Sequence, residues 1–378
     1  MNDILFLIFN VTLYIQYARS LYCWGMTRTA ERYVFAFFLM MIQIMGSLLL
    51  LGAIGWLYPA PAIGLNAAIL LAVKMFSPPI SPPVDRDKSW QEIAAPISNK
   101  LIIFAAAVVT CWLFICAYFL PPRGGDDIVY HLPFIYDSIQ HGRWVLLPTE
   151  LRIHFAYPMN AEVLFSWPLI FLGDTRWVDG VNIPVGLWTA GVMYLFSRHF
   201  GLRRASAAFI SGVFFLTPIV VAQMGTNYVD LISAGILLSS LYLVIRFLNN
   251  GSTIYSCLAF FSIAAMMGMK YHLLFFGLIL LVILVSRLSR KRRLAETIVG
   301  LIIVAILGLG WHVRNYIQFS DWLYPVRASA GYWDLQSQSV GDMIRSVLEK
   351  INFVFLSGKN CGTYDGGFGT IFAFIAFL

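Results

Sequence analysis

The chain has 378 residues, of which 59% are hydrophobic and only 12% are charged, and its formal net charge is +7. Soluble domains of average composition carry about 25% charged residues, so this composition and a mean hydropathy of +0.75 exclude an ordinary soluble protein. The apolar runs approach ~20 residues, whereas strands of a membrane barrel alternate over about 10. The sequence therefore predicts an all-α, polytopic transmembrane bundle. Its basic residues lie mostly in short loops and do not indicate nucleic-acid binding.

Apolar segments long enough for helical spans recur along the chain. They cover roughly 4–19, 33–57, 62–77, 101–120, 179–198, 205–223, 228–247, 253–268, 271–287 and 295–314. The N-terminus lacks a basic region and a small-residue cleavage site, which predicts a retained span rather than a signal peptide. The segment 367–378 has about 12 residues, too few to cross ~30 Å of hydrocarbon, and indicates either a truncated chain or a half-helix.

Three short connectors collect basic side chains and predict the orientation. They contain Arg19, Arg28 and Arg32; Arg198, Arg203 and Arg204; and Arg287, Arg290, Lys291, Arg292 and Arg293. All three connectors can lie on the cytoplasmic side only if an even number of spans separates each from the next. This holds if the piece at 161–173 does not cross the membrane. That piece is about 13 residues long and contains Pro168, so we predict an interfacial or re-entrant helix. The loops at 121–177, 224–229, 269–270 and 315–365 then share the outer face.

The five cysteines show no CxxC spacing. Cys111, Cys116 and Cys257 lie within apolar runs, where cysteine commonly serves as a packing residue. We predict neither a disulfide nor a metal site from them.

Ionisable side chains gather in the loops of the predicted outer face. The stretch 123–162 holds Asp126 and Asp127, together with His131 and His154, directly after an apolar span. Such a stretch is a plausible place for chemistry at a membrane surface, although an ordinary solvated loop is the simpler alternative. Its aromatic residues could stack on sugars, but they more often form the interfacial belt.

Two charged residues of the same face lie at or just inside helix ends, Asp230 in the sequence NYVD and Lys270 in GMKY. A charge at the bilayer centre costs at least ~2.5–3.5 kcal/mol, so such residues usually face a cavity or a partner. A purely structural Asp230–Lys270 ion pair is the alternative.

These residue types favour group transfer from a lipid phosphate. An acidic pair can act as a general base toward an acceptor, or can bind a divalent cation such as Mg²⁺ or Mn²⁺ through its oxygens. Lys270 and Arg314 at the boundary could stabilise the charge of a departing phosphate.

Several motifs follow one another in a recognisable order. They are GGDDIVYH after a span, HFAYPMNAEVLFSWPLIFLGD, RHFGLRRASAAFISGVFFLTPIV, NYVD, GMKY and WHVRNYIQFSDWLYPV. In this order the chain resembles the GT-C glycosyltransferases, which use polyprenyl-phosphate sugars. They include the protein O-mannosyltransferases, the aminoarabinose transferases of lipid A and the oligosaccharyltransferase catalytic subunits, and the chain is most similar to the bacterial family 39-like members. The resemblance covers residues 101–378 as a catalytic core with loops at 121–177 and 315–365. It leaves 1–100 as accessory helices.

The resemblance implies an inverting sugar transfer on the extracytoplasmic face of the bacterial plasma membrane. The donor would be a polyprenyl-phosphate sugar, and the acceptor a lipid, glycan or protein. Asp126 and Asp127 would be the catalytic pair, with Asp127 slightly favoured and also the candidate metal ligand. The substrate-binding residues would be His131, His154, Glu162, Asp230, Lys270 and Arg314.

One departure from the resemblance concerns the metal site. The aminoarabinose transferases carry a Glu-Lys pair before the proline, where this chain has Ala156 and Tyr157. Glu162 follows a few residues later and is the available substitute.

Two other classes of function compete with the transferase. A lipid-linked glycan flippase or other transporter predicts paired broken helices at the midplane and symmetry between halves, and the sequence shows neither. A non-enzymatic assembly subunit would not need Asp126, Asp127, Asp230 and Lys270 on one side.

Overall fold

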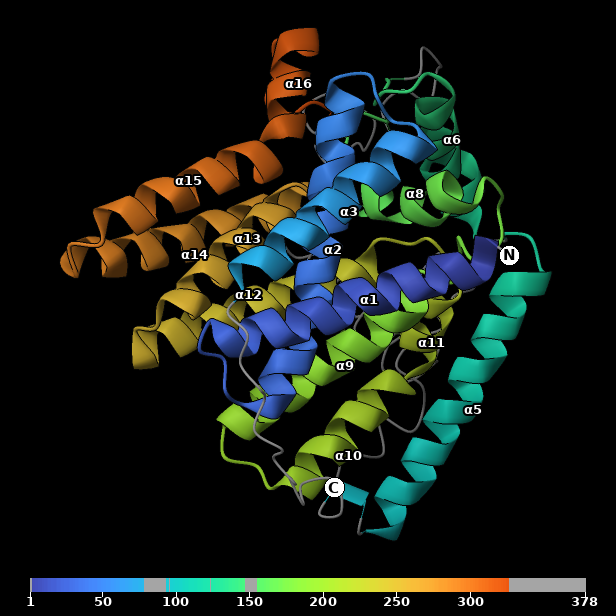
Figure 1. Ribbon diagram of the computed structural model, residues 1–378. Helices are drawn as coiled ribbons and strands as arrows, with labels where there is room; N and C mark the ends of the chain where they lie inside the picture. Colours follow the sequence, from blue (N-terminus) through green and yellow to red (C-terminus); the bar gives the residue numbers. More distant parts are fainter. Residues whose placement is uncertain (1, 78–92, 95, 123, 147–154, 326–378) are drawn as a thin grey trace, which may run out of the picture.

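The computed structural model describes residues 2–77, 93–94, 96–122, 124–146 and 155–325. Within these ranges every regular element is a helix (Figure 1). Six helices are long and apolar enough to cross a membrane, or up to eight if each of two bent pairs is one span. They indicate a membrane protein and confirm the predicted all-helical bundle. Three expected features lie outside the described residues: His154, residues 326–365 of the second expected loop, and the segment 367–378.

The six candidate spans agree closely with expected segments. They are α1 (Asn2–Cys23), α2 (Thr29–Ala53), α3 (Pro59–Phe76), α5 (Ile97–Phe119), α12 (Asp230–Asn250) and α14 (Tyr271–Arg290). The expected spans at 179–198 and 253–268 form α9 (Asn182–His199) and α13 (Thr253–Met267), which are not among the six. With 15 residues, α13 is about 22 Å long and falls short of ~30 Å of hydrocarbon.

Two expected spans are broken rather than continuous. The first divides into α10 (Arg204–Phe215) and α11 (Pro218–Met224), which meet at 64°. The second divides into α15 (Leu294–Gly308) and α16 (Gly310–Phe319), which meet at 54°. Pro218 lacks an amide hydrogen and begins a new helix, which explains the first bend. The sequence had indicated continuous spans at both places, and hydropathy gave no sign of either bend.

The helices pack as one continuous bundle. α12 contacts α9 and α13, and α13 contacts α14 and α15 (Figure 1). On the other side α9 contacts α10, which contacts α5. The N-terminal helices α1, α2 and α3 pack against one another, and all three also contact α8 (Asn160–Leu172). The accessory helices thus lie directly on an element of the expected core.

The helix α8 occupies the predicted position, but its environment differs from an interfacial helix. Apart from Phe171, all its side chains are buried, including Glu162 and Pro168. The indole Nε1 of Trp167 donates a hydrogen bond of 3.1 Å to Asn10 of α1. An interfacial helix would leave one face exposed, and α8 leaves none because α1, α2 and α3 cover it. The helix ends at Gly173, whose φ of +74° is a conformation that glycine adopts without strain.

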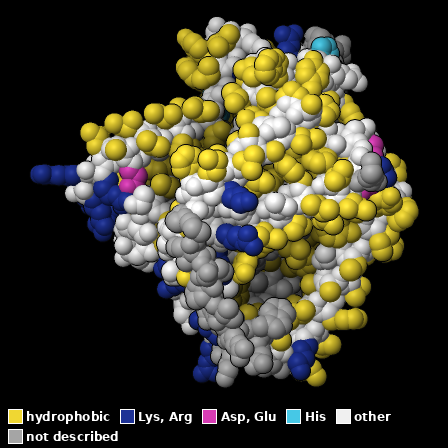
Figure 2. Space-filling view, in the orientation of Figure 1, with side chains coloured by type: hydrophobic (Ala, Val, Ile, Leu, Met, Phe, Trp, Pro, Cys, Tyr) yellow, Lys and Arg dark blue, Asp and Glu magenta, His cyan; other side chains and the backbone are white. Residues whose placement is uncertain are grey.

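The helix ends fall into two groups, as the predicted parity requires. At one end Asn99 of α5 donates to the carbonyl of Ala205 in α10, at 3.0 Å. At the other end the amide of Asn160 donates to the carbonyl of Gly268, also at 3.0 Å. Figure 2 shows a largely hydrophobic face, with many Lys and Arg side chains along its left and lower margins and a few at its centre and top. The basic connectors and the expected outer loops are therefore at opposite ends of the bundle.

Candidate functional site

The two adjacent aspartates have opposite environments. Asp127 begins the π-helix η1 (Asp127–His131), which continues into α6 (Leu132–Gln140), and Asp126 precedes it. Consecutive helical side chains point in different directions, so Asp126 is exposed while Asp127 is fully buried. The phenol of Tyr130, one turn later, donates a hydrogen bond of 3.3 Å to the Asp126 carboxylate. The exposed carboxylate is therefore the accessible member of the pair.

The buried carboxylate joins the first loop to the NYVD corner. The backbone amide of Asn227 donates to Asp127 Oδ2 at 3.0 Å, and Oδ1 has no partner among the described residues. Burial raises the pKa of Asp127, against the lowering effect of the Asn227 amide. A Cβ on Gly124 would lie 2.2 Å from Asp127 Oδ2, so only glycine leaves room for this carboxylate.

Two further polar side chains fix the same corner. Asn227 Nδ2 donates to the buried Asp179 at 2.5 Å. Asn182, at the start of α9, donates to the backbone carbonyls of Thr226 and Tyr228, each at 2.8 Å. These bonds satisfy backbone groups in a region without helix, and they hold the corner against Asp127.

A histidine–carboxylate pair connects η1 to α8. His131 Nδ1 and Glu162 Oε1 are 2.7 Å apart, and the two side chains are 2% and 4% exposed. The second oxygen of Glu162 is buried and has no partner among the described residues. Glu162 lies in the first turn of α8, where the helix dipole favours a negative charge.

The predicted Asp230–Lys270 ion pair is present. Lys270 Nζ contacts Asp230 Oδ1, and the two residues stand at the N-terminal ends of α14 and α12. The Asp230 side chain is 62% exposed and that of Lys270 is 27% exposed. The pair is accessible from outside, so both the structural and the substrate-binding interpretation remain compatible with it.

The charged groups near Tyr130 come from several segments of the chain. The pKa of this tyrosine is raised above its ordinary value, first by burial and then by the negative charges of Asp126, Glu162 and Asp230. We name the set the acidic cluster; its members are Asp126, Asp127, Tyr130, His131, Glu162, Asp230 and Lys270. The structure thus brings together six predicted site residues from four separate segments, along with Tyr130.

Arg314 lies in a neighbouring network. Its Nη2 donates to the backbone carbonyls of Ala156 at 2.8 Å and Tyr157 at 3.3 Å, and its guanidinium stands over the Trp311 ring at 4.8 Å. Asn315 donates to the Ala156 carbonyl at 2.7 Å and to the Tyr271 hydroxyl at 2.7 Å. Arg314 thus donates mainly to backbone carbonyls through Nη2. Its Nη1 has no hydrogen-bond partner among the described residues.

The sequence prediction also named Asp127 as a metal ligand. Among the residues described here, no three or more His, Cys, Asp or Glu side chains are placed to hold a metal ion. One oxygen of Asp127 already accepts the Asn227 amide. The donor set does not fit a divalent cation at Asp127.

Sequence reasoning missed several residues that organise the site. Asn160 donates to the carbonyls of Ala265 at 3.2 Å and Leu307 at 3.0 Å, and it accepts the Trp311 indole at 2.8 Å. Asp179 and Asn182 hold the NYVD corner in a similar way. The signal available was a polar side chain at the start of an apolar helix, which by itself does not identify a partner.

At the opposite end, Glu31 is a buried hub that sequence reasoning also missed. It accepts hydrogen bonds from Tyr242, at 2.6 Å, and from Tyr255, and it pairs with Arg246 at 3.2 Å. It ties α2 to α12 and α13 at their basic ends.

The fold and the site define an all-helical membrane bundle with ionisable side chains clustered at the end opposite its basic connectors. No family model, curated protein or solved structure matches the chain.

Proposed function

We propose that the chain is a membrane glycosyltransferase that moves a sugar from a polyprenyl-phosphate carrier to an acceptor on the extracytoplasmic face. The observation that carries the proposal is the acidic cluster. Its carboxylates and its lysine come from η1, α8, α12 and the start of α14, segments that are far apart in the sequence. Ionisable groups brought together at the end of an apolar bundle are typical of a functional site.

Asp126 is the member best suited to act as the base. Its carboxylate is exposed, so the hydroxyl of an acceptor can approach it, whereas Asp127 is enclosed. We therefore assign the base to Asp126 and a positioning role to Asp127, which reverses the slight preference drawn from sequence.

The proposed step is an inverting displacement. Asp126 takes the proton of the acceptor hydroxyl, whose oxygen forms a bond to the anomeric carbon. The bond from that carbon to the phosphate oxygen breaks on the opposite face, and the phosphate leaves with the electron pair. Lys270 stabilises the charge that develops on the phosphate, and Asp230 orients the ammonium group.

The remaining cluster members have supporting roles in this proposal. The Tyr130 phenol donates to Asp126 and keeps its carboxylate in one orientation. His131 and Glu162 connect η1 to α8, so the first loop is held against the bundle. Arg314 is kept as a substrate-binding candidate through its unpartnered Nη1 alone.

The broken helices favour a transporter as the second candidate. Transporters place such breaks near the bilayer midplane. Here α10 has 12 residues and α15 has 15, so the breaks lie about 18 and 22 Å from the basic ends of these helices. If both helices ran along the bilayer normal from its inner boundary, both breaks would lie beyond the midplane of ~30 Å of hydrocarbon, toward the acidic cluster. Their position fits a site at the outer boundary better than a central pathway.

One experiment separates the two candidates. The purified protein is incubated with a polyprenyl-phosphate sugar, and the release of free polyprenyl phosphate is measured. Asp126→Asn should slow release about 10²–10⁴-fold, whereas Asp137→Asn, at a partly exposed carboxylate of α6, should retain it. Movement of the intact lipid across vesicles without release of the sugar would favour the transporter. Release that persists unchanged in Asp126→Asn would overturn the assignment of the base.

A further inference from the structure

An open hollow lies at the basic end of the bundle, far from the acidic cluster. It has a volume of about 530 Å³ and is lined by Arg198, Arg203, Arg204 and Ala205. Arg198 is in the last turn of α9, and Arg204 is the first residue of α10. The lining of the hollow therefore comes from two helix ends and the turn between them.

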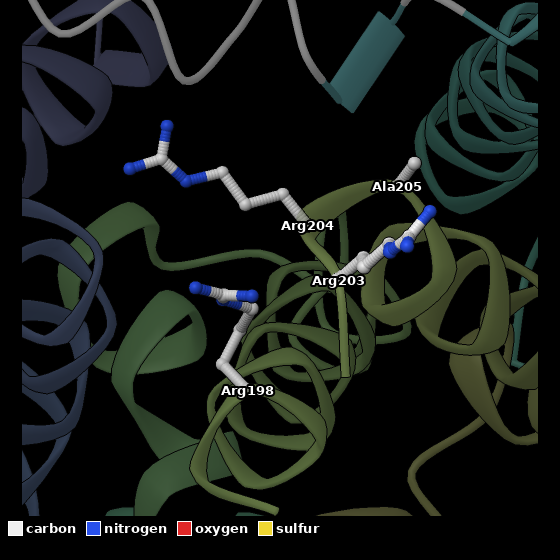
Figure 3. Close-up of a pocket in the computed structure, with 4 residues that line it drawn as sticks. All are labelled: Arg198, Arg203, Arg204 and Ala205. Atoms are coloured by element: carbon white, nitrogen blue, oxygen red, sulfur yellow. The ribbon is translucent and has the colours of Figure 1, made fainter. Parts of the chain in front are cut away.

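The arginines approach the hollow from different sides. In Figure 3, Arg198 and Arg204 extend from the two helices toward the same side, while Arg203 extends to the other side, near Ala205. Arg198 Nη1 donates to the backbone carbonyl of Leu202, which fixes the direction of its side chain. Several donors thus face a space large enough for a polar group.

The charges of Arg198 and Arg203 are not offset by carboxylates within the part of the chain that the structure describes. Other arginines of the chain do have such partners: Arg246 pairs with Glu31 at 3.2 Å, and Arg293 pairs with Glu296. Within that part, Arg198 and Arg203 give the hollow positive charge that an anionic ligand would complement.

We propose that this hollow binds the phosphate group of an anionic phospholipid. The guanidinium group offers paired N–H donors that match phosphate oxygens, and it is weakly hydrated compared with an ammonium group. The connector is one of the three that the sequence places on the cytoplasmic side, where anionic lipids are concentrated. The first turn of α10 has no side-chain cap, so its amide groups and dipole add to the attraction.

The test uses the full chain, purified and mixed with phosphatidylglycerol or phosphatidylcholine, with bound lipid counted by native mass spectrometry. The pocket variant combines Arg198→Gln, Arg203→Gln and Arg204→Gln. The control combines Arg287→Gln, Arg290→Gln and Arg292→Gln, which removes equal charge from another of the three basic connectors. We expect phosphatidylglycerol binding to weaken roughly tenfold or more in the pocket variant and to change little in the control.

Three results would overturn the proposal. The first is equal loss in both triple variants, which would mean that general charge attracts the lipid. The second is equal binding of the two lipids by the unmodified protein. The third is displacement of phosphatidylglycerol by millimolar inorganic phosphate, which would make the hollow a site for the free anion. If the pocket variant does not fold, the single variants Arg198→Gln and Arg203→Gln are compared with Arg290→Gln in the same assay.

Discussion

Separate substitution of the two adjacent aspartates should give two different kinds of defect. Asp126 is exposed, and its carboxylate accepts a hydrogen bond from the phenol of Tyr130. Asp126→Asn keeps the shape of the side chain and removes its basicity. Loss of a general base slows catalysis by about 10²–10⁴-fold, which corresponds to about 3–5 kcal/mol of activation free energy. We expect transfer to fall by this factor while the free energy of unfolding stays nearly constant.

The substitution of Asp127 should act through the fold. Asp127 is fully buried, and its Oδ2 accepts the amide of Asn227 at 3.0 Å. Asp127→Ala leaves that buried amide without an acceptor, which costs about 1–3 kcal/mol of unfolding free energy. Gly124→Ala should act in the same direction, because its Cβ would stand 2.2 Å from Oδ2 and push the carboxylate away.

The assay for both substitutions combines the initial rate of polyprenyl phosphate release with the thermal unfolding of the detergent-solubilised protein. Asp126→Asn should change the rate alone, and Asp127→Ala should change the unfolding temperature with or without a change in rate. The reverse pattern, a stable Asp127→Ala without activity and an active Asp126→Asn, would refute the assignment of roles.

Three further predictions concern the pKa of one group and the strength of two contacts. Burial raises the pKa of Asp127 above 3.8, so the folded protein holds this proton more tightly than the unfolded chain does. As the pH falls from 7 toward 4, the unfolding temperature of the unmodified protein should rise relative to Asp127→Asn; a constant difference would contradict this. Lys270→Ala and Asp230→Asn should lower the transfer rate, yet each should cost less than about 1 kcal/mol of stability, because Asp230 is 62% exposed. Loss of stability with full transfer would show a purely structural pair. Asn160→Ala breaks hydrogen bonds to two backbone carbonyls and to Trp311, so denaturant unfolding should show a larger loss of stability than the about 1 kcal/mol of a single hydrogen bond. A loss of about 1 kcal/mol or less would disprove that Asn160 holds these three groups together.

The spans were predictable because length and apolar character decide them. A run of about 20 apolar residues satisfies its backbone internally only as a helix, so the positions of α2, α5, α12 and α14 follow directly. The bends were not predicted, because hydropathy measures the length of a run and not its direction. Pro218 carried the local signal for one bend, since it follows Thr217 within an apolar segment.

The composition of the site was predictable in part from the number of spans between the basic connectors. Placing the basic connectors on one side requires the loops with Asp127, Asp230 and Lys270 to share the other side, and in the structure they do. The burial of Asp127 and the partners of Asn160 depend on tertiary packing, which adjacent sequence does not encode. The residues 311–315 illustrate the difference, because the motif indicated a site but its side chains are largely engaged by backbone carbonyls.

The enclosure of α8 connects the accessory helices to the acidic cluster. Glu162 stands in the first turn of α8 and contacts His131 of the first loop. The same helix is held by Asn10 of α1 through Trp167, and α2 holds the first loop through the indole of Trp144, which donates to the carbonyl of Leu48 at 3.1 Å. The cluster is thus supported from both sides, by α1–α3 and by the core. Since a buried histidine–carboxylate pair keeps its geometry only when its surroundings are fixed, residues 2–77 support the proposed site and are more than an added anchor.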